Sequence, residues 1–231
     1  MGRRSGIGDS GRGASARQVG GGNLGGVTRS DEQLERLLRE VRACRVCEPH
    51  LPLGPRPVLR AGVRSRVLIV GQAPGMRVHE TGIPWNDPSG DRLREWLHVS
   101  REDFYDERRF AIIPTGLCYP GRGRSGDLPP RPECAPLWHP RLRPLLPNIG
   151  LTLLVGQYAQ AYYLGARRKA TVTATVHATR EYLPDFLPLP HPSPRNTRWL
   201  QVNPWFVRDV IPVLRQRVHA LLERFSAIAS P

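Results

Sequence analysis

Short apolar runs alternate along this chain with stretches in which apolar residues recur every three or four positions. The apolar runs predict buried strands, and the three-to-four spacing predicts helices that bury one face. Strands are predicted at 67–70, within 110–117, at 151–156 and, bounded by prolines, within 186–194. Helices are predicted within 30–47, at 89–97, 131–146 and 157–165, and at 208–225. Ser30 or Asp31 is the expected cap of the first helix, and Pro140 is expected to interrupt the third.

This order of elements predicts an α/β fold with a mainly parallel sheet that helices cover on both faces. The length of 231 residues suits one domain, which we place at 31–231. Residues 1–30 are rich in glycine and arginine and are expected to form a disordered tail. The segments 71–91, 115–121 and 191–196 each follow a strand, so they are expected to meet at one edge of the sheet.

The charge of the chain indicates which kind of partner it binds. The chain has 34 lysines and arginines against 20 acidic residues, a net charge of +14 that favours nucleic acid. Nearly all of the positive charge is arginine, whose planar guanidinium suits phosphate. No apolar run is long enough for a membrane span, and the N-terminus lacks the apolar core of a secretory signal. We therefore expect a cytoplasmic monomer, associated with the nucleoid if the source is bacterial.

The four cysteines form a second pattern. Cys44 and Cys47 are a C-x2-C pair at a helix end, and Cys118 and Cys134 lie far downstream. Without a secretory signal, such thiols are more typical of metal ligands than of disulfides. Four thiolates suit either tetrahedral zinc or an iron–sulfur cluster, and the spacing does not choose between them.

The glycine-containing loop after the first strand has the wrong chemistry for a nucleotide phosphate. Its sequence, GQAPG at 71–75, lacks both the Gly-Lys-Ser/Thr of a phosphate-binding loop and the G-x-G-x-x-G of a dinucleotide site. No helix is expected to follow it directly. Trp85, Asn86 and Asp87 lie in the same segment, and an aromatic plane near a carboxylate suits a planar heterocycle.

Three motifs in this order resemble the uracil-DNA glycosylase superfamily, and specifically its iron–sulfur branch. They are GQAPG with the TGIPW and SGDRL that follow it, HPSPRN at 191–196, and the cysteine spacing. The resemblance covers roughly residues 31–225. It implies a single-domain three-layer α/β/α sandwich that hydrolyses the N-glycosidic bond of uracil in DNA. It also implies that Cys44, Cys47, Cys118 and Cys134 hold a 4Fe–4S cluster, with zinc as the alternative.

The resemblance also implies roles for individual residues. Trp85 would stack on the extruded base, and His191 would donate a hydrogen bond to the departing base. Asp87 would orient water or stabilise the positive charge on the sugar. The other expected base contacts are Gly71, Gln72, Ala73 and Asn86, and the expected DNA contacts are Arg122, Arg124, Ser193, Arg195 and Asn196.

Three positions depart from the family's pattern. Ala73 stands where the classical enzymes carry an acid, and Gln72 where cluster-bearing relatives often carry Glu. Pro114 stands where many relatives carry the asparagine that reads uracil. Other deaminated bases are therefore open as substrates. Two further hypotheses stand beside the glycosylase: a non-catalytic or crosslinking relative that binds uracil-containing or damaged DNA, and a metal-stabilised RNA-binding module.

Overall fold

The centre of the protein is a sheet of four strands. The computed structural model describes residues 28–124 and 126–229, so the tail predicted at 1–30 lies outside the description except for its last three residues. The strand order is β2-β1-β5-β6, and all neighbours are parallel, as predicted. The strands are β1 (Val67–Val70), β2 (Phe110–Ile112), β5 (Leu151–Val155) and β6 (Phe186–Leu189).

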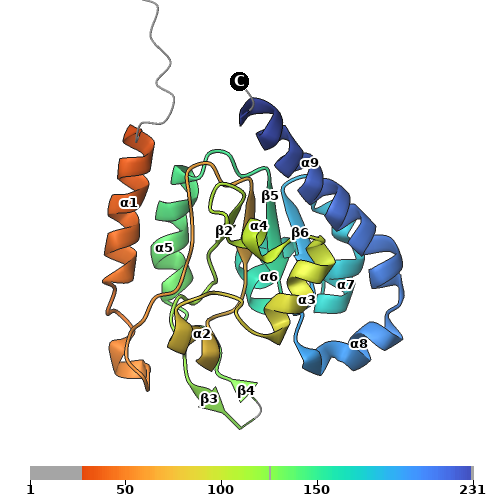
Figure 1. The fold of residues 1–231 in the computed structure, drawn as a ribbon. Coiled ribbons are helices and arrows are strands. Elements are labelled where there is room, and N and C mark those ends of the chain that lie inside the picture. Colours follow the sequence, from red (N-terminus) through yellow and green to blue (C-terminus); the bar gives the residue numbers. More distant parts are fainter. Residues whose placement is uncertain (1–27, 125, 230–231) are drawn as a thin grey trace, which may run out of the picture.

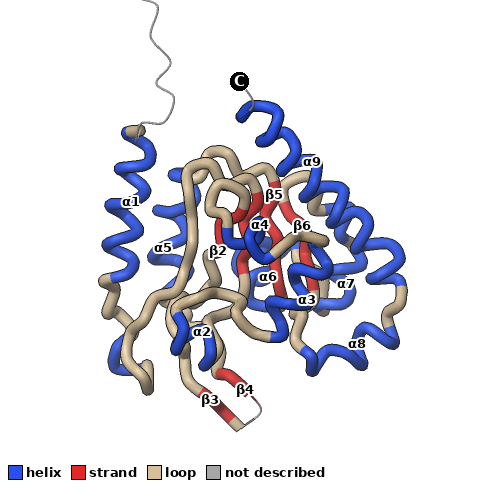
Figure 2. Tube along the Cα trace, in the orientation of Figure 1, coloured by secondary structure: helices blue, strands red, loops and turns tan. Residues whose placement is uncertain are grey.

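Helices cover both faces of this sheet and make a three-layer α/β/α domain (Figures 1 and 2). Val67 and Ile69 point into one hydrophobic cluster, while Leu68 and Val70 point into the other, because successive side chains of a strand face opposite sides. The first cluster is closed by α3 (Pro88–Leu97), α4 (Arg101–Tyr105), α7 (Val172–His177) and α9 (Ile211–Ala229). The second is closed by α1 (Arg29–Arg42), α5 (Cys134–Leu142) and α6 (Gln157–Leu164).

The first helix, α1, begins earlier than predicted. Thr28 is its N-cap, and Asp31 completes a capping box with it, so neither Ser30 nor Asp31 occupies the cap position. The predicted apolar stripe is buried: Leu34, Leu37, Leu38 and Val41.

Two predicted boundaries were wrong. The strand predicted within 110–117 ends at Ile112, just before the chain turns at Pro114. Helix α5 runs through Pro140 to Leu142, because a proline in the last turn removes only one helical hydrogen bond. A 3₁₀ turn at Arg143–Leu145 then extends it.

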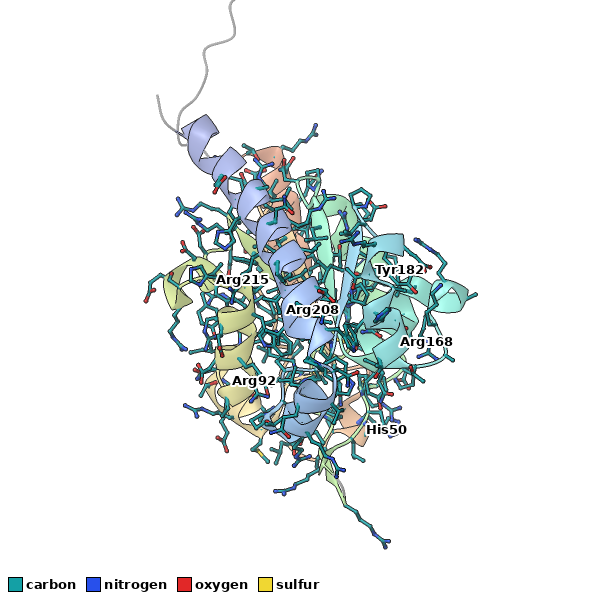
Figure 3. All side chains as sticks on the ribbon, turned by 90° about the vertical axis from the view of Figure 1, so that its right-hand side faces the viewer. His50, Arg92, Arg168, Tyr182, Arg208 and Arg215 are labelled. Atoms are coloured by element: carbon teal, nitrogen blue, oxygen red, sulfur yellow. The ribbon has the colours of Figure 1, made fainter. Side chains whose placement is uncertain are left out.

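The last helix, α9, lies along the sheet (Figure 3). A π-helical turn at Phe206–Val210 precedes it, so the regular helix starts at Ile211 rather than near 208. Leu214 and Val218 lie on its buried face. Arg215 ties α9 to α3 by donating to the carbonyl oxygens of Trp96 and Glu95, at 3.1 and 3.0 Å.

Several elements carry little apolar pattern and were not predicted. The helix α2 (Met76–Thr81) follows the GQAPG loop at once, which corrects the expectation that no helix does so. A two-stranded hairpin, β3 (Arg122–Gly123) and β4 (Gly126–Asp127), projects below α2 in Figure 1. The others are α4, α7, α8 (Thr197–Val202) and short 3₁₀ turns at Glu48–His50, Gly165–Arg167, Thr179–Glu181 and Pro194–Asn196. No described helix combines the length and apolar character of a membrane span.

Candidate functional site

A pocket of about 570 Å³ lies at the carboxyl ends of the strands. The loops after β1, β2 and β6 all line it, so the three segments expected at one edge do meet there. The β3–β4 hairpin closes a further side. This is the position at which ligands bind in open α/β sheets.

The loop after β1 forms one wall of the pocket with its backbone. The carbonyl oxygens of Gly71 and Gln72 accept hydrogen bonds from the backbone N–H groups of Thr115 and Gly116, at 3.0 and 2.8 Å. The Thr115 hydroxyl also donates to Gln72, at 2.7 Å. No hydrogen bond among the described residues uses the N–H of Gln72 or Ala73. These two donors therefore remain for a ligand's carbonyl oxygen.

Trp85 is fixed beside this loop in an unusual backbone conformation. Its φ is 56°, in the left-handed region that few non-glycine residues adopt. Its indole lies against Gly71, where a Cβ would come within 2.9 Å of Cζ2. Arg94 Nη1 donates to the Trp85 carbonyl oxygen at 3.3 Å, and Tyr105 donates to that of Pro84 at 2.8 Å. The ring is thus held at the pocket, with its plane tilted 35° from His191 and the ring centroids 5.7 Å apart.

His191 follows β6 and presents one nitrogen for a ligand. The Ser193 N–H donates to His191 Nδ1 at 3.2 Å, so Nδ1 is the acceptor and the neutral ring carries its proton on Nε2. Burial lowers the pKa of His191, and the nearby Asp87 carboxylate opposes this shift. The loop itself is held by Asn196, whose amide donates to the His191 carbonyl oxygen at 2.8 Å.

Asp87 has two functions in this geometry. It is the N-cap of α3, with Oδ1 accepting from the Gly90 N–H at 2.9 Å. It also lines the pocket together with Trp85 and His191.

The decisive comparison is with protein-family models. Residues 60–215 match the model of the uracil DNA glycosylase superfamily. The chain belongs to this superfamily. The matched range contains the whole four-stranded sheet and every lining residue of the pocket except Val58, and the α/β architecture agrees with the superfamily's fold. The match is to the superfamily as a whole, so the iron–sulfur branch stays a prediction.

Most of the base and DNA contacts predicted from the superfamily's motifs do line the pocket: Gly71, Gln72, Ala73, Trp85, Arg122, Ser193 and Arg195. Gln72 is partly engaged, since its amide donates to the Leu128 carbonyl oxygen at 3.3 Å. Asn86 is not among the lining residues, and its Oδ1 accepts from Arg101 at 2.9 Å. Arg124 lies exposed at the tip of the hairpin, and Asn196 supports the loop rather than lining the pocket.

The lining residues that sequence reasoning missed include Tyr119 and Asp127. Asp127 ends β4, and Tyr119 is almost completely buried between the cysteine-bearing loop and α2. Both belong to the segment 119–127, which had been interpreted only through its arginines. The available signal was an aspartate in a glycine-rich stretch that follows a strand of the sheet.

The four cysteines come together in a separate small cavity of about 20 Å³, beside Trp138 and Arg131. Burial raises the pKa of the Cys118 thiol to about 11 and that of Cys134 to about 12. The Leu117 N–H points at the Cys134 sulfur, 3.3 Å away. Among the described residues, no group of three or more His, Cys, Asp or Glu side chains is arranged to hold one metal ion.

Proposed function

We propose that this protein is a DNA glycosylase that hydrolyses the N-glycosidic bond of uracil or of another deaminated base. The observation that carries the proposal is His191. Its Nδ1 is occupied by the Ser193 N–H, which leaves the proton-bearing Nε2 for a ligand in a pocket that Trp85 also lines. A neutral donor beside an aromatic plane is what a departing pyrimidine anion requires.

The mechanism begins with extrusion of the target nucleotide, because the glycosidic bond is inaccessible in stacked DNA. Trp85 stacks on the base, and the N–H groups of Gln72 and Ala73 bind a base carbonyl oxygen. The C–N bond then breaks and its electron pair passes to the base. His191 Nε2–H donates to the developing anion, an interaction worth about 3–4 kcal/mol in comparable sites. Asp87 stabilises the positive charge that forms on the sugar.

Selectivity for uracil rests on shape and backbone donors in this proposal. Pro114 has no side-chain donor, and its carbonyl oxygen lies 3.1 Å from His139 Nε2. At this position no amide side chain is present to distinguish the carbonyl and ring N–H of uracil from those of another base. Hypoxanthine and xanthine carry the same pairing of a carbonyl with a ring N–H, so they are included as candidate substrates.

DNA binding would use the arginines around the pocket. Arg122 and Arg195 line it, and Arg124 extends from the same hairpin. We propose that they contact phosphates on either side of the extruded nucleotide, since arginine binds phosphate through paired N–H groups.

We also propose that the four cysteines hold a 4Fe–4S cluster. Four partly buried thiols around one cavity fit a metal group, because burial opposes the ionisation of Cys118 and Cys134 and a bound cation reverses that penalty. The resemblance to the iron–sulfur branch favours a cluster over a single zinc. When bound, the group would supply crosslinks between α1, the loop after β2 and α5. Glycosidic hydrolysis needs no electron transfer, so its role here is structural.

The test is base excision from a single-stranded and a double-stranded oligonucleotide that contains one uracil, followed by alkaline cleavage at abasic sites. We expect cleavage by the parent protein and a loss of about 100-fold or more in His191→Gln. His50→Gln, at an exposed histidine outside the pocket, is the matched control and should equal the parent. No product from uracil, hypoxanthine or xanthine would overturn the proposal and favour the non-catalytic damage-binding alternative.

A further inference from the structure

The hairpin β3–β4 is part of the pocket, although its residues belong to none of the three motifs that carry the superfamily resemblance. It contributes Arg122, Gly126 and Asp127 to the lining. The hairpin also contacts the loop after β1 and the loop after β6. Gln72 donates to the Leu128 carbonyl oxygen at the end of β4, and a Cβ on Gly126 would lie 2.6 Å from Arg195 Nη1. The hairpin is therefore fixed against both motif loops.

Asp127 is the acidic residue that this hairpin brings to the pocket. Its Oδ2 lies 3.3 Å from the position that a Cβ on Gly75 would take, so the carboxylate reaches the glycine loop. No hydrogen bond or ion pair among the described residues occupies this carboxylate. Asp87, in contrast, has one oxygen committed to the Gly90 N–H as a helix cap. The pocket thus contains two carboxylates of different character.

We propose that Asp127 is a catalytic residue, the carboxylate that binds the attacking water and accepts its proton. This inference rests on the proposed glycosylase function. As the C–N bond breaks and its electron pair passes to the base, the water oxygen bonds to the anomeric carbon. The proton leaving that water passes to Asp127. Asp87 keeps its place as the cap of α3 and stabilises the charge on the sugar.

The surroundings of Asp127 suit a proton acceptor. Burial raises its pKa, and the Asp87 charge acts in the same direction, while Arg195 and Arg122 oppose the shift. Burial raises the pKa of Tyr119, and the charge of Asp127 acts in the same direction. A carboxylate whose pKa moves toward the working pH accepts a proton better than one with an ordinary pKa. The solvent-exposed position of Asp127 gives water a route to it.

The experiment compares the parent protein with Asp127→Asn and with Asp185→Asn. Asp185 is an exposed aspartate just before β6, at the opposite edge of the sheet, so it is a matched control. Single-turnover excision is measured with enzyme in excess. Binding is measured separately, on an oligonucleotide whose uracil nucleotide carries a fluorine on the sugar that blocks cleavage.

We expect Asp127→Asn to lower the single-turnover rate by about 100-fold or more. Binding of the uncleavable oligonucleotide should be equal or tighter, since a negative charge has been removed from a DNA-facing pocket. The parent rate should rise with pH to a plateau, and Asp127→Asn should lose this rise. Asp185→Asn should match the parent in both measurements.

Three outcomes would count against the proposal. A rate for Asp127→Asn close to that of the parent would overturn it while leaving the glycosylase function intact. A lower rate accompanied by equally weakened binding or a lower melting temperature would also overturn it, because that pattern indicates a structural role. No excision by the parent on any deaminated base would overturn the proposed function and this inference together.

Discussion

Gly90→Ala should damage the site through a single methyl group. Gly90 lies in the first turn of α3, directly under the backbone of Trp85. A Cβ at this position would lie 1.8 Å from the Trp85 carbonyl oxygen and 2.9 Å from the Trp85 Cβ. The first contact is with backbone, so no side-chain rotation relieves it, and Trp85 already has a left-handed φ.

The magnitude follows from this overlap. The Trp85 carbonyl must move by roughly 1 Å, and overpacking of this kind costs about 1–3 kcal/mol of unfolding free energy. For a domain of this size each kcal/mol lowers the melting temperature by about 2–4 °C. The same displacement moves the indole away from its position over Gly71. A misplacement of about 1 Å in a positioning group can lower a rate by about 100-fold.

Thermal unfolding and single-turnover excision measure the two effects separately. The control is Gly150→Ala, whose new methyl would come closest to the Leu221 side chain, with Cδ2 at 2.6 Å and Cδ1 at 3.5 Å. A flexible side chain can move aside, so this variant should keep the parent's excision rate. If Gly90→Ala retained both the melting temperature and the rate of the parent, the packing of Trp85 against α3 would not position the stacking ring.

Three further predictions concern protons, metal and salt. Burial lowers the pKa of His139 and His191 in the folded chain, so the unfolded chain binds protons first as the pH falls below about 6.5. The free energy of unfolding, measured with denaturant, should therefore be lower at pH 5 than at pH 7. This difference should be smaller in His139→Gln than in the parent. An equal difference in the two proteins would contradict the prediction. Cys118→Ser should lower the iron and sulfide bound per chain, measured chemically, whereas zinc in the parent without sulfide would refute the cluster. Arg195→Ala should reduce the slope of the log binding constant for DNA against log salt concentration by about 1. Arg208→Ala, at an exposed arginine in the π-helical turn before α9, should leave this slope unchanged.

The sheet was predictable because burial on both faces leaves a direct signature in the sequence. Val67–Val70 and Leu151–Val155 are nearly continuous apolar runs, and both are central strands. The hairpin Arg122–Asp127 has no apolar residue, so no periodicity could reveal it. Contacts with Gln72 and Arg195 hold it in place, and such contacts exist only after the chain has folded. The helix α2 was missed for a similar reason, since Val78 is its single buried residue.

The site shows the same division between pattern and geometry. The motif resemblance placed Trp85, Asp87 and His191 together, and all three line the pocket. Asn86 was wrongly included, because adjacency in a motif says nothing of direction. The left-handed backbone of Trp85 redirects the chain there, and the Asn86 side chain meets Arg101 instead.

Helix α5 joins the cysteine cavity to the pocket at the carboxyl ends of the strands. Cys134 is its first residue and lines the cavity, while His139, one turn further along, reaches the Pro114 carbonyl oxygen in the pocket wall. The Tyr163 hydroxyl lies 2.7 Å from His139 Nδ1, so both ring nitrogens of His139 have a hydrogen-bond partner. We therefore expect Cys134→Ser to change the relative rates of excision of uracil and hypoxanthine, and not only the melting temperature. A variant with a lower melting temperature but the parent's ratio of rates would show that the wall at Pro114 is set independently of the cysteines.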